Sequence, residues 1–310
     1  MNDAPRILVT PRSLTADGLD VVDDLQPLRD RGFDLVGPRP GRLPTEDELL
    51  ELLPGCVGWL AGVERIGEHV LKSAPDLRVI SRNGAGTDAI DLDAAARAGV
   101  AVVRAQGANA QGVAELALTL VLCSLRHVPA AASALRDGRW ARIQGAEIAE
   151  RTVGIVGLGA VGTRTAAIFT ALGAHVVGYD PVAVDPAVES LGLDELLGVA
   201  DVISLSCPPQ RDGRPMITAE RLSRVRPGTV LINTARSALV DDEAVLAALE
   251  DGTLSTYAVD AFDGEPPEPS ALLRHERVIA TPHLGGYTTT SVRRATMMAV
   301  DNLIAALDAP

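Results

Sequence analysis

The sequence of 310 residues predicts an α/β fold made of two doubly wound parallel sheets. Short runs of Val, Ile and Leu recur in both halves of the chain, and segments with helical periodicity separate them. A glycine-rich turn also stands where one of these runs passes into a helix-like segment. Near-continuous apolar runs are typical of parallel strands buried on both faces, and the chain is long enough for two cores.

Five apolar runs predict the strands of a first α/β unit. They are RILVT, FDLVG, VGWLA, RVIS and VAVV, at residues 6–10, 33–37, 57–61, 78–81 and 100–103. Helix-like stretches alternate with them. We therefore expect these strands to be parallel and to belong to one buried sheet.

A long apolar helix is predicted next, over residues 109–127, with Asn109 placed to cap its start and Pro129 just beyond its end. Six further strands follow, with helical patterns in the gaps between them. These strands are TVGIV, AHVVGY, DVISLS, GTVLIN, STYAVD and RVIAT, at residues 152–156, 174–179, 201–206, 228–233, 255–260 and 277–281. The alternation predicts a doubly wound sheet. An amphipathic helix over residues 290–307 closes the chain.

Composition and charge argue against several classes of protein. The formal net charge of −13 disfavours a nucleic-acid partner, because binding a phosphate backbone usually requires a basic face. We expect no membrane partner, since no apolar run approaches the length of a membrane span and no basic-then-apolar leader opens the chain. The three cysteines are widely spaced, which suggests neither a disulfide framework nor a metal site. A soluble protein of the reducing cytoplasm fits these features.

The stretch TVGIVGLGAVG contains Gly157, Gly159 and Gly162 as G-x-G-x-x-G, after a predicted strand and at the start of a predicted helix. Such a triplet alone is weak evidence, because glycines also occur in ordinary turns. In this context the first glycine permits the tight turn, the second lets a pyrophosphate approach the backbone, and the third lets helix and strand pack closely. The helix start supplies N–H groups for the phosphates. The stretch thus predicts a dinucleotide site.

Asp180 ends the next predicted strand, in VVGYDP, about 20 residues beyond the glycine loop. A carboxylate at this point accepts hydrogen bonds from ribose hydroxyls and repels a 2′-phosphate. The sequence therefore predicts NAD as the cofactor in preference to NADP.

Four polar side chains follow later strands of the same predicted sheet: Arg236, Asp260, Glu265 and His283. Each has an ordinary explanation by itself, as a surface cation, a cap, a loop acid and a turn residue. Together they provide a His that can move a proton, a carboxylate that can orient and charge it, and a guanidinium that can hold a substrate carboxylate. Because open α/β sheets bind ligands beyond the carboxyl ends of their strands, these residues predict a catalytic site.

Several ordered stretches closely resemble the D-isomer-specific 2-hydroxyacid dehydrogenases, especially phosphoglycerate dehydrogenase-like members without a regulatory domain. They are LRVISRNGAGTDAIDLDAAARAGV, NAQGVAELAL, DGRWAR, TVGIVGLGAVG, INTARSALVDDEAV and TPHLGG. The resemblance implies a Rossmann NAD-binding domain, residues 105–288, inserted into a flavodoxin-like substrate-binding domain, residues 1–104 and 289–310. It also implies a homodimer, and the apolar helix from Asn109 agrees with that expectation. Because the chain ends at Pro310, soon after the closing helix, we expect no regulatory domain.

The resemblance further assigns roles to residues of the matching motifs. His283 is implied as the proton carrier, Glu265 as the group that stabilises its imidazolium, and Arg236 as the ligand of the substrate carboxylate. Implied cofactor contacts are Gly157, Gly159, Ala160, Val161, Gly162, Asp180, Cys207, Pro208, Thr234, Ala235, Asp260, Gly285 and Gly286. Implied or candidate substrate contacts are Arg82, Asn83, Gly84, Ala85, Gly86 and Arg104.

The chain departs from the family pattern at Cys207, where a His is common, and at Arg104, which lies in a stretch that commonly reads Asn-Ala-Pro. Arg104, Arg82 beside the NGAGTD loop, and three arginines of the stretch LRDGRWARIQ are either solvated surface charges or ligands of a second anionic group; the three are Arg136, Arg139 and Arg142. We therefore expect NAD-dependent hydride transfer to or from a small anionic D-2-hydroxy acid or 2-keto acid, with a phosphate or phosphonate group as one variant. A phosphite-type dehydrogenase and an NAD-sensing corepressor are the alternatives.

Overall fold

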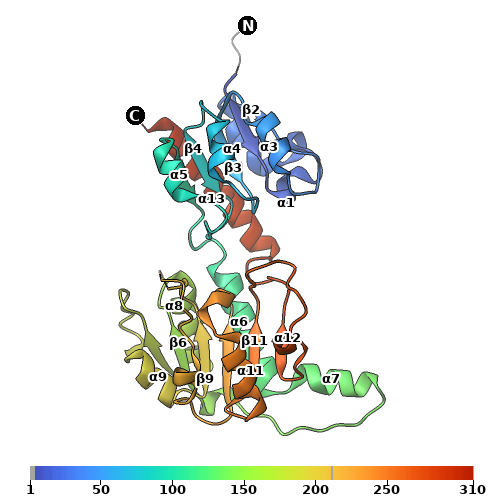
Figure 1. Ribbon diagram of the computed structural model, residues 1–310, viewed down its shortest axis with the longest axis vertical. Helices are drawn as coiled ribbons and strands as arrows, with labels where there is room; N and C mark the ends of the chain where they lie inside the picture. Colours follow the sequence, from blue (N-terminus) through green and yellow to red (C-terminus); the bar gives the residue numbers. More distant parts are fainter. Residues whose placement is uncertain (1–3, 211, 310) are drawn as a thin grey trace. The chain divides into compact units, whose positions relative to one another are not determined.

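The computed structural model describes residues 4–210 and 212–309, which form two compact units. The first unit comprises the chain up to Asn109 and again from Thr289, and the second unit is Ala110–Thr288 (Figure 1). The second unit is thus inserted into the first. In the first unit, the two segments of the chain meet near the insertion point, where the Arg294 Nε donates to the Ala108 carbonyl at 2.9 Å. In the second unit, the beginning and the end of the segment also meet, because a Cβ at Gly285 would lie 3.7 Å from the Val113 Cα.

The first unit contains a five-stranded sheet in which every strand is parallel to its neighbours. Its strands are β1 (Arg6–Val9), β2 (Asp34–Val36), β3 (Cys56–Ala61), β4 (Val79–Arg82) and β5 (Ala101–Arg104). Their order is β2-β1-β3-β4-β5, as in flavodoxin-like sheets. The order reverses between β1 and β3, which is where such sheets bind ligands. All five predicted strands are confirmed.

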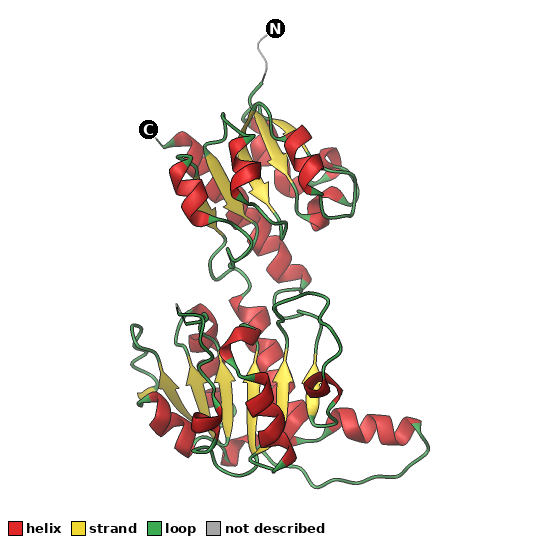
Figure 2. Ribbon diagram, viewed as in Figure 1, coloured by secondary structure: helices red, strands yellow, loops and turns green. Residues whose placement is uncertain are grey.

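Helices cover both faces of this sheet (Figure 2). They are α1 (Arg12–Thr15), α2 (Gln26–Asp30), α3 (Glu46–Leu52), α4 (Glu68–Lys72), α5 (Leu92–Arg97) and α13 (Thr289–Asp308). Alternate side chains of the strands point to opposite faces, so that Leu8 and Trp59 join one apolar cluster while Ile7 and Leu60 join the other. The closing helix α13 completes the second cluster.

The second unit contains a seven-stranded parallel sheet, in the order β12-β11-β10-β9-β6-β7-β8. Its strands are β6 (Thr152–Val156), β7 (His175–Tyr179), β8 (Glu189–Ser190), β9 (Val202–Leu205), β10 (Thr229–Asn233), β11 (Leu254–Val259) and β12 (Val278–Ala280). The order is that of a Rossmann sheet extended by β12. The six predicted strands are present. The exposed edge strand β8 was not predicted, because two polar residues leave no periodicity.

The helices of the second unit include the long apolar helix predicted from the sequence. They are α6 (Ala110–Leu125), α7 (Val128–Arg136), α8 (Ala160–Ala171), α9 (Leu193–Val199), α10 (Ala219–Leu222), α11 (Asp242–Glu250) and α12 (Ala271–Arg274). Pro129 does not end helical structure as expected. His127 turns the chain at φ 52°, and Pro129 lies in the first turn of α7, where its missing N–H breaks no hydrogen bond.

Within residues 4–210 and 212–309, no single helix is both long and apolar enough to cross a bilayer. Only α6 and α7 taken together reach that length and apolar content, as a pair bent by 62°.

Candidate active site

The predicted site residues of the second unit gather at one edge of its sheet. Because the strands are parallel, the loops that follow them emerge together at their carboxyl ends. The glycine loop follows β6, Asp180 follows β7, Cys207 and Pro208 follow β9, Thr234, Ala235 and Arg236 follow β10, Asp260 and Glu265 follow β11, and His283, Gly285 and Gly286 follow β12. This edge therefore carries both the expected nucleotide loop and the expected catalytic groups.

The three glycines between β6 and α8 satisfy three different steric requirements. Gly157 has φ +98°, and a Cβ there would lie 2.8 Å from the Cys207 backbone nitrogen. A Cβ at Gly162 would lie only 1.8 Å from the Gly157 carbonyl oxygen, so that α8 can pack on β6 only with glycine at this position. A Cβ at Gly159 would meet nothing within 4 Å. Gly159 therefore leaves open space at the start of α8, where a diphosphate would approach the backbone.

Asp180 joins the glycine loop to the end of β7. Its carboxylate accepts hydrogen bonds from the backbone nitrogens of Leu158 at 2.8 Å, Val182 at 2.9 Å and Ala183 at 2.8 Å. Burial alone would raise the pKa of Asp180, but the hydrogen bonds from Ala183, Val182 and Leu158 outweigh it and lower the pKa. The carboxylate is therefore anionic at neutral pH, and its remaining lone pairs suit ribose hydroxyls.

His283 and Glu265 form a hydrogen-bonded pair. The His283 Nδ1 lies 2.7 Å from the Glu265 Oε1, which also accepts from the Phe262 backbone nitrogen at 3.3 Å. The two side chains are 49% and 41% exposed, so the imidazole can reach a ligand. With Nδ1 facing the carboxylate, Nε2 is the ring atom available for proton exchange. His283 adopts φ 52°, which is uncommon for a residue with a side chain.

Asp260 anchors the loop that carries His283. It is 1% exposed. Its Oδ1 accepts from the Thr281 hydroxyl at 2.6 Å and the Leu284 backbone nitrogen at 2.7 Å, and its Oδ2 accepts from the Gly285 backbone nitrogen at 2.8 Å. The sequence assigned only a cofactor contact to Asp260. The structure shows that its carboxylate links β11 to residues on both sides of His283, which fixes the position of the imidazole.

Asn233 orients the turn that carries Arg236, and sequence reasoning gave it no role of its own. It is fully buried at the end of β10. Its Nδ2 donates to the Arg236 carbonyl at 2.9 Å, and its Oδ1 accepts from the Ala235 backbone nitrogen at 3.1 Å. The signal that could have identified it is an amide side chain at the end of an otherwise apolar strand, LIN, because a buried amide needs partners.

Cys207 adjoins the glycine loop with its thiol in the neutral form. Burial, with a smaller contribution from the charge of Asp180, raises its pKa to about 11. A neutral thiol next to Gly157 is compatible with an anionic diphosphate. The Thr234 hydroxyl oxygen at the same edge is buried without a hydrogen-bond partner among the described residues, and a ligand group or a water can satisfy it.

In the first unit, the loop Asn83–Gly86, which the resemblance implies as a substrate contact, follows β4. Arg82 and Arg104 are neighbours in the register of β4 and β5. The Arg82 Nη1 donates to the Asn83 carbonyl at 2.5 Å, and the Arg104 Nη1 donates to the Ala85 carbonyl at 3.3 Å. Both guanidinium groups thus hold carbonyl oxygens of the loop and place positive charge beside it. Gly84 has φ +150°, a backbone conformation that residues with a Cβ rarely adopt, so the turn favours glycine at this position.

Two other features lie away from these edges. Arg136, Arg139 and Arg142 are exposed in α7 and the segment after it, and Arg139 pairs with Asp137 at 3.0 Å.

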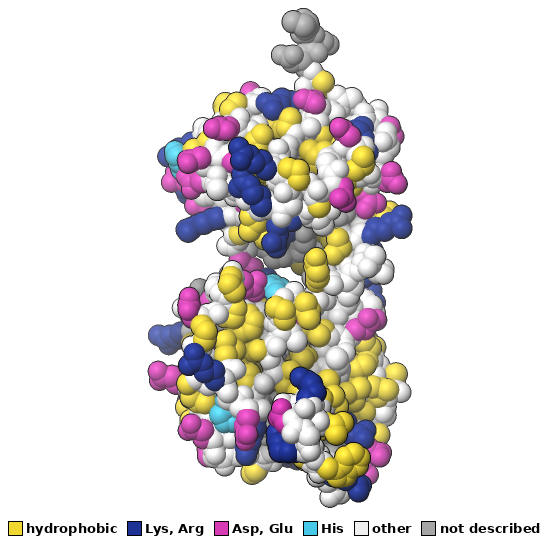
Figure 3. Space-filling view, turned by 90° about the vertical axis from the view of Figure 1, so that its right-hand side faces the viewer, with side chains coloured by type: hydrophobic (Ala, Val, Ile, Leu, Met, Phe, Trp, Pro, Cys, Tyr) yellow, Lys and Arg dark blue, Asp and Glu magenta, His cyan; other side chains and the backbone are white. Residues whose placement is uncertain are grey.

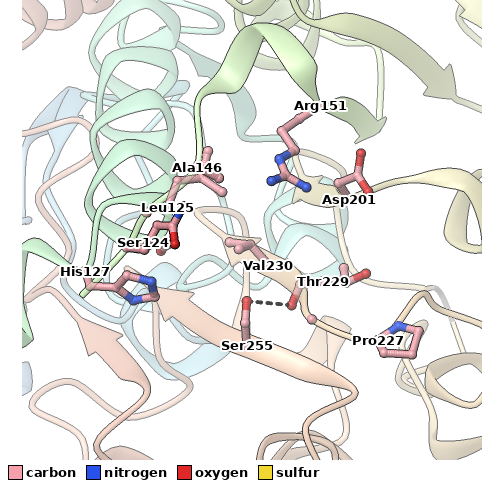
Figure 4. A pocket seen from close by; sticks show the side chains of 13 residues that line it. Ser124, Leu125, His127, Ala146, Arg151, Asp201, Pro227, Thr229, Val230 and Ser255 are labelled. Carbon is pink, nitrogen blue, oxygen red and sulfur yellow. Dashed lines mark hydrogen bonds between the residues drawn. The ribbon is translucent and has the colours of Figure 1, made fainter.

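A cavity of about 390 Å³ opens near the amino ends of β6, β9, β10 and β11, opposite the predicted site (Figure 4). Its lining includes Arg151 and His127. It contains none of the predicted catalytic or cofactor residues.

Comparison with known proteins agrees with this geometry. Residues 118–285 match the family model described as D-isomer specific 2-hydroxyacid dehydrogenase, NAD binding domain. The D-3-phosphoglycerate dehydrogenase of Mycobacterium tuberculosis is 39% identical over 261 residues, which is 81% of this chain and 49% of that protein. The chain spans about half the length of the curated relatives it matches.

Solved structures match over nearly the whole chain. The TT0316 protein from Thermus thermophilus has a TM-score of 0.87 at 34% identity, covering 98% of this chain and 97% of that one. A glyoxylate reductase from Paecilomyes thermophila has a TM-score of 0.86 at 25% identity, covering 99% and 96%.

Proposed function

The chain belongs to the D-isomer specific 2-hydroxyacid dehydrogenase family and carries its NAD-binding domain, and on that basis we propose that it is an NAD-dependent dehydrogenase of D-2-hydroxy acids. It would interconvert such an acid and the matching 2-keto acid by hydride transfer. The observation that carries this proposal is the His283–Glu265 pair, at the same sheet edge as the glycine loop and Asp180. A proton carrier and a dinucleotide site are the two parts that such a reaction requires.

The residues at this edge fit NAD. The open space at Gly159, the backbone nitrogens at the start of α8 and the Asp180 carboxylate suit a diphosphate followed by a ribose with a free 2′-hydroxyl. When bound, NAD accepts or donates the hydride at its nicotinamide ring. We assign the remaining cofactor contacts to Ala160, Val161, Gly162, Cys207, Pro208, Thr234, Ala235, Asp260, Gly285 and Gly286.

In the proposed mechanism, His283 moves the proton. During oxidation its Nε2 takes the proton of the substrate hydroxyl, and during reduction the imidazolium returns it. Glu265 holds the ring through Nδ1 at 2.7 Å, selects its tautomer and stabilises the imidazolium. Arg236 binds the substrate carboxylate and polarises the carbonyl oxygen, and Asn233 orients the backbone of its turn.

The two domains divide the work in this proposal. Residues 105–288 bind NAD and supply Arg236 and His283, and residues 1–104 with 289–310 supply the other substrate contacts. Backbone nitrogens of the loop Asn83–Gly86 receive the substrate carboxylate, and Arg82 and Arg104 strengthen the binding by placing positive charge beside that loop. The curated relatives are named for a phosphorylated substrate, which makes a phosphorylated acid one candidate for this chain.

We also infer a homodimer in the cytoplasm. Exposed apolar side chains gather on α7 and the segment after it, and hydrophobic side chains are prominent on the face of the second unit in Figure 3. Trp140 is 79% exposed, Leu135 60% and Ile143 50%, and a second copy would cover them. The free cysteines suit a reducing compartment. Light scattering at several concentrations tests the dimer, and a monomer at every concentration would refute it.

The proposed activity is tested by NADH oxidation at 340 nm with a panel of 2-keto acids: hydroxypyruvate, glyoxylate, pyruvate, phosphohydroxypyruvate and phosphonopyruvate. The reverse reaction is run with NAD and the matching D- and L-hydroxy acids. We expect turnover of at least one keto acid and oxidation of D-isomers only. Absence of turnover across the panel by a protein that binds NADH would refute the proposed function.

A further inference from the structure

The carboxyl edge of the five-stranded sheet contains a buried glutamate that takes no part in the proposed mechanism. Glu64 lies in the turn after β3 and is only 4% exposed. β3 is one of the two strands between which the strand order reverses, and the other is β1. Thr10 follows β1 directly and is fully buried. Ligands of flavodoxin-like sheets bind at this reversal, so a buried charge here bears on what the unit can bind.

Glu64 is held by a closed network of hydrogen bonds. Its Oε1 accepts from the Gly62 backbone nitrogen at 2.8 Å and from the Thr10 hydroxyl. The Thr10 oxygen in turn accepts from the Trp59 Nε1 at 3.0 Å and the Gly62 nitrogen at 3.1 Å. The Glu64 Oε2 is buried without a hydrogen-bond partner among the described residues. The carboxylate is thus fixed beneath the turn, and its Oε2 receives no hydrogen bond from the described residues to offset its burial.

This network engages two groups that could otherwise bind an anion at the β1 and β3 ends. The Gly62 N–H and the Thr10 hydroxyl both point to the Glu64 carboxylate instead of to a ligand. A Cβ at Gly62 would lie 2.6 Å from the Glu64 Oε2 and 3.1 Å from the Pro11 Cα, so the turn is also closed against a larger residue. The cations of these two turns, Arg12 after β1 and Arg65 after β3, are exposed and therefore well screened by solvent.

The opposite end of the same edge has the opposite charge. Arg82 and Arg104 flank the loop after β4, which we propose as the carboxylate site. This loop adjoins the Glu64 turn, because the Asn83 backbone nitrogen donates to the Ala61 carbonyl at 2.9 Å. The side-chain charges that hydrogen bonds hold in place at this edge thus form a gradient, from positive at β4 and β5 (Arg82 and Arg104) to negative at β1 and β3 (Glu64). A ligand with one anionic end matches this gradient, whereas a ligand with two does not.

We propose that Glu64 determines substrate specificity by excluding a second anionic group, so that the substrate is a monoanionic 2-hydroxy or 2-keto acid with an uncharged side chain. This inference rests on the proposed function. It separates the chain from relatives whose names specify a phosphorylated acid. Glu64 acts through its field and through the turn it closes, and it is a positioning residue that touches no reacting atom.

The test compares hydroxypyruvate with phosphohydroxypyruvate, which differ by one phosphate. For the unaltered protein we expect kcat/KM to be higher for hydroxypyruvate by about tenfold or more. Glu64→Gln keeps an oxygen that can accept from Gly62 and Thr10 but removes the charge. It should raise kcat/KM for phosphohydroxypyruvate about tenfold, mainly through KM, and leave hydroxypyruvate within about twofold.

Glu68→Gln is the matched control, because Glu68 is an exposed acid of the same unit that pairs with Lys72 and Arg97. It should leave the substrate ratio unchanged. A preference of the unaltered protein for phosphohydroxypyruvate would overturn the proposal. So would an unchanged ratio in Glu64→Gln, or an equal change in Glu68→Gln.

Calorimetric titration of the full chain with D-glycerate and with 3-phospho-D-glycerate separates this inference from the proposed activity. Tighter binding of D-glycerate, with the difference reduced by Glu64→Gln, supports the inference even if neither compound is turned over, in which case only the proposed activity fails. Equal or tighter binding of the phosphorylated compound overturns the inference, and no binding of either compound overturns both.

Discussion

Gly162→Ala and Gly159→Ala should separate the packing role of the glycine loop from its role in binding the cofactor. A Cβ at Gly162 would lie 1.8 Å from the Gly157 carbonyl oxygen, whereas real Cβ atoms keep at least 3.0 Å from a neighbour. That oxygen belongs to the backbone and cannot rotate away, so α8 must move relative to β6. At Gly159 a Cβ would meet nothing within 4 Å, and the backbone φ of −73° suits alanine.

The free energy of unfolding should therefore fall only in Gly162→Ala. Overpacking costs about 1–3 kcal/mol, and occasionally more. The 1.8 Å clash with backbone places this substitution at the upper end of that range, and alanine returns up to about 1 kcal/mol of helix propensity, so we expect a net loss of about 2 kcal/mol. For a unit the size of Ala110–Thr288, this loss lowers Tm by about 4–8 °C. Gly159→Ala should leave Tm unchanged but weaken NADH binding, because its methyl group occupies the approach of the diphosphate.

Thermal unfolding followed by circular dichroism gives Tm, and titration of NADH followed by its fluorescence gives Kd. The reasoning is refuted if Gly162→Ala unfolds at the temperature of the unaltered protein. It is equally refuted if Gly159→Ala binds NADH with unaltered affinity.

Three further predictions concern single side chains. His283→Ala should lower kcat by about 10²–10⁴-fold while Kd for NADH is retained. As a control, His69→Ala removes a surface His–Glu pair with the same 2.7 Å distance and should leave kcat unchanged. Equal losses of kcat in the two variants would contradict the mechanism. Asp180→Ala should reduce the preference for NAD over NADP in kcat/KM, and an unchanged ratio would argue against the ribose contact. Because burial raises the pKa of Cys207 to about 11, its alkylation by iodoacetamide, followed by peptide mass spectrometry, should be slow at pH 8 and rise about tenfold per pH unit towards that value. An early plateau below pH 10, like that of an added free thiol, would show that the thiol is not shielded.

Most of the fold was predictable because buried parallel strands consist of continuous apolar residues. All eleven predicted strands are present, each within one or two residues of its expected bounds. The two features that the sequence did not predict each depend on only one or two residues. Glu189–Ser190 pairs with β7 over only two residues, and the left-handed conformation of His127 divides a predicted single helix from α7. Neither leaves a periodic pattern in the sequence.

The candidate site was predictable in composition but not in its connections. Loops after parallel strands had to meet at one edge, which brought His283 and Glu265 to the same side of the sheet. Their 2.7 Å contact, and the three hydrogen bonds by which Asp260 anchors the His283 loop, depend on side-chain positions that no spacing reveals. Glu64 shows the same limit, because its sequence context reads as a loop acid and only its burial makes it informative.

The insertion of the second unit into the first also determines how the two units can be separated by cutting the chain. The chain leaves the first unit just after Ala108 and re-enters it at α13, where Arg294 is bonded to Ala108. In the second unit, Val113 near its beginning lies beside Gly285 near its end, because a Cβ at Gly285 would lie 3.7 Å from the Val113 Cα. Each unit therefore has its two cut points side by side, and a short peptide can replace the missing partner. Such excision would yield two separately expressible proteins, and the same geometry allows one nucleotide module to be exchanged for another without redesign of its host.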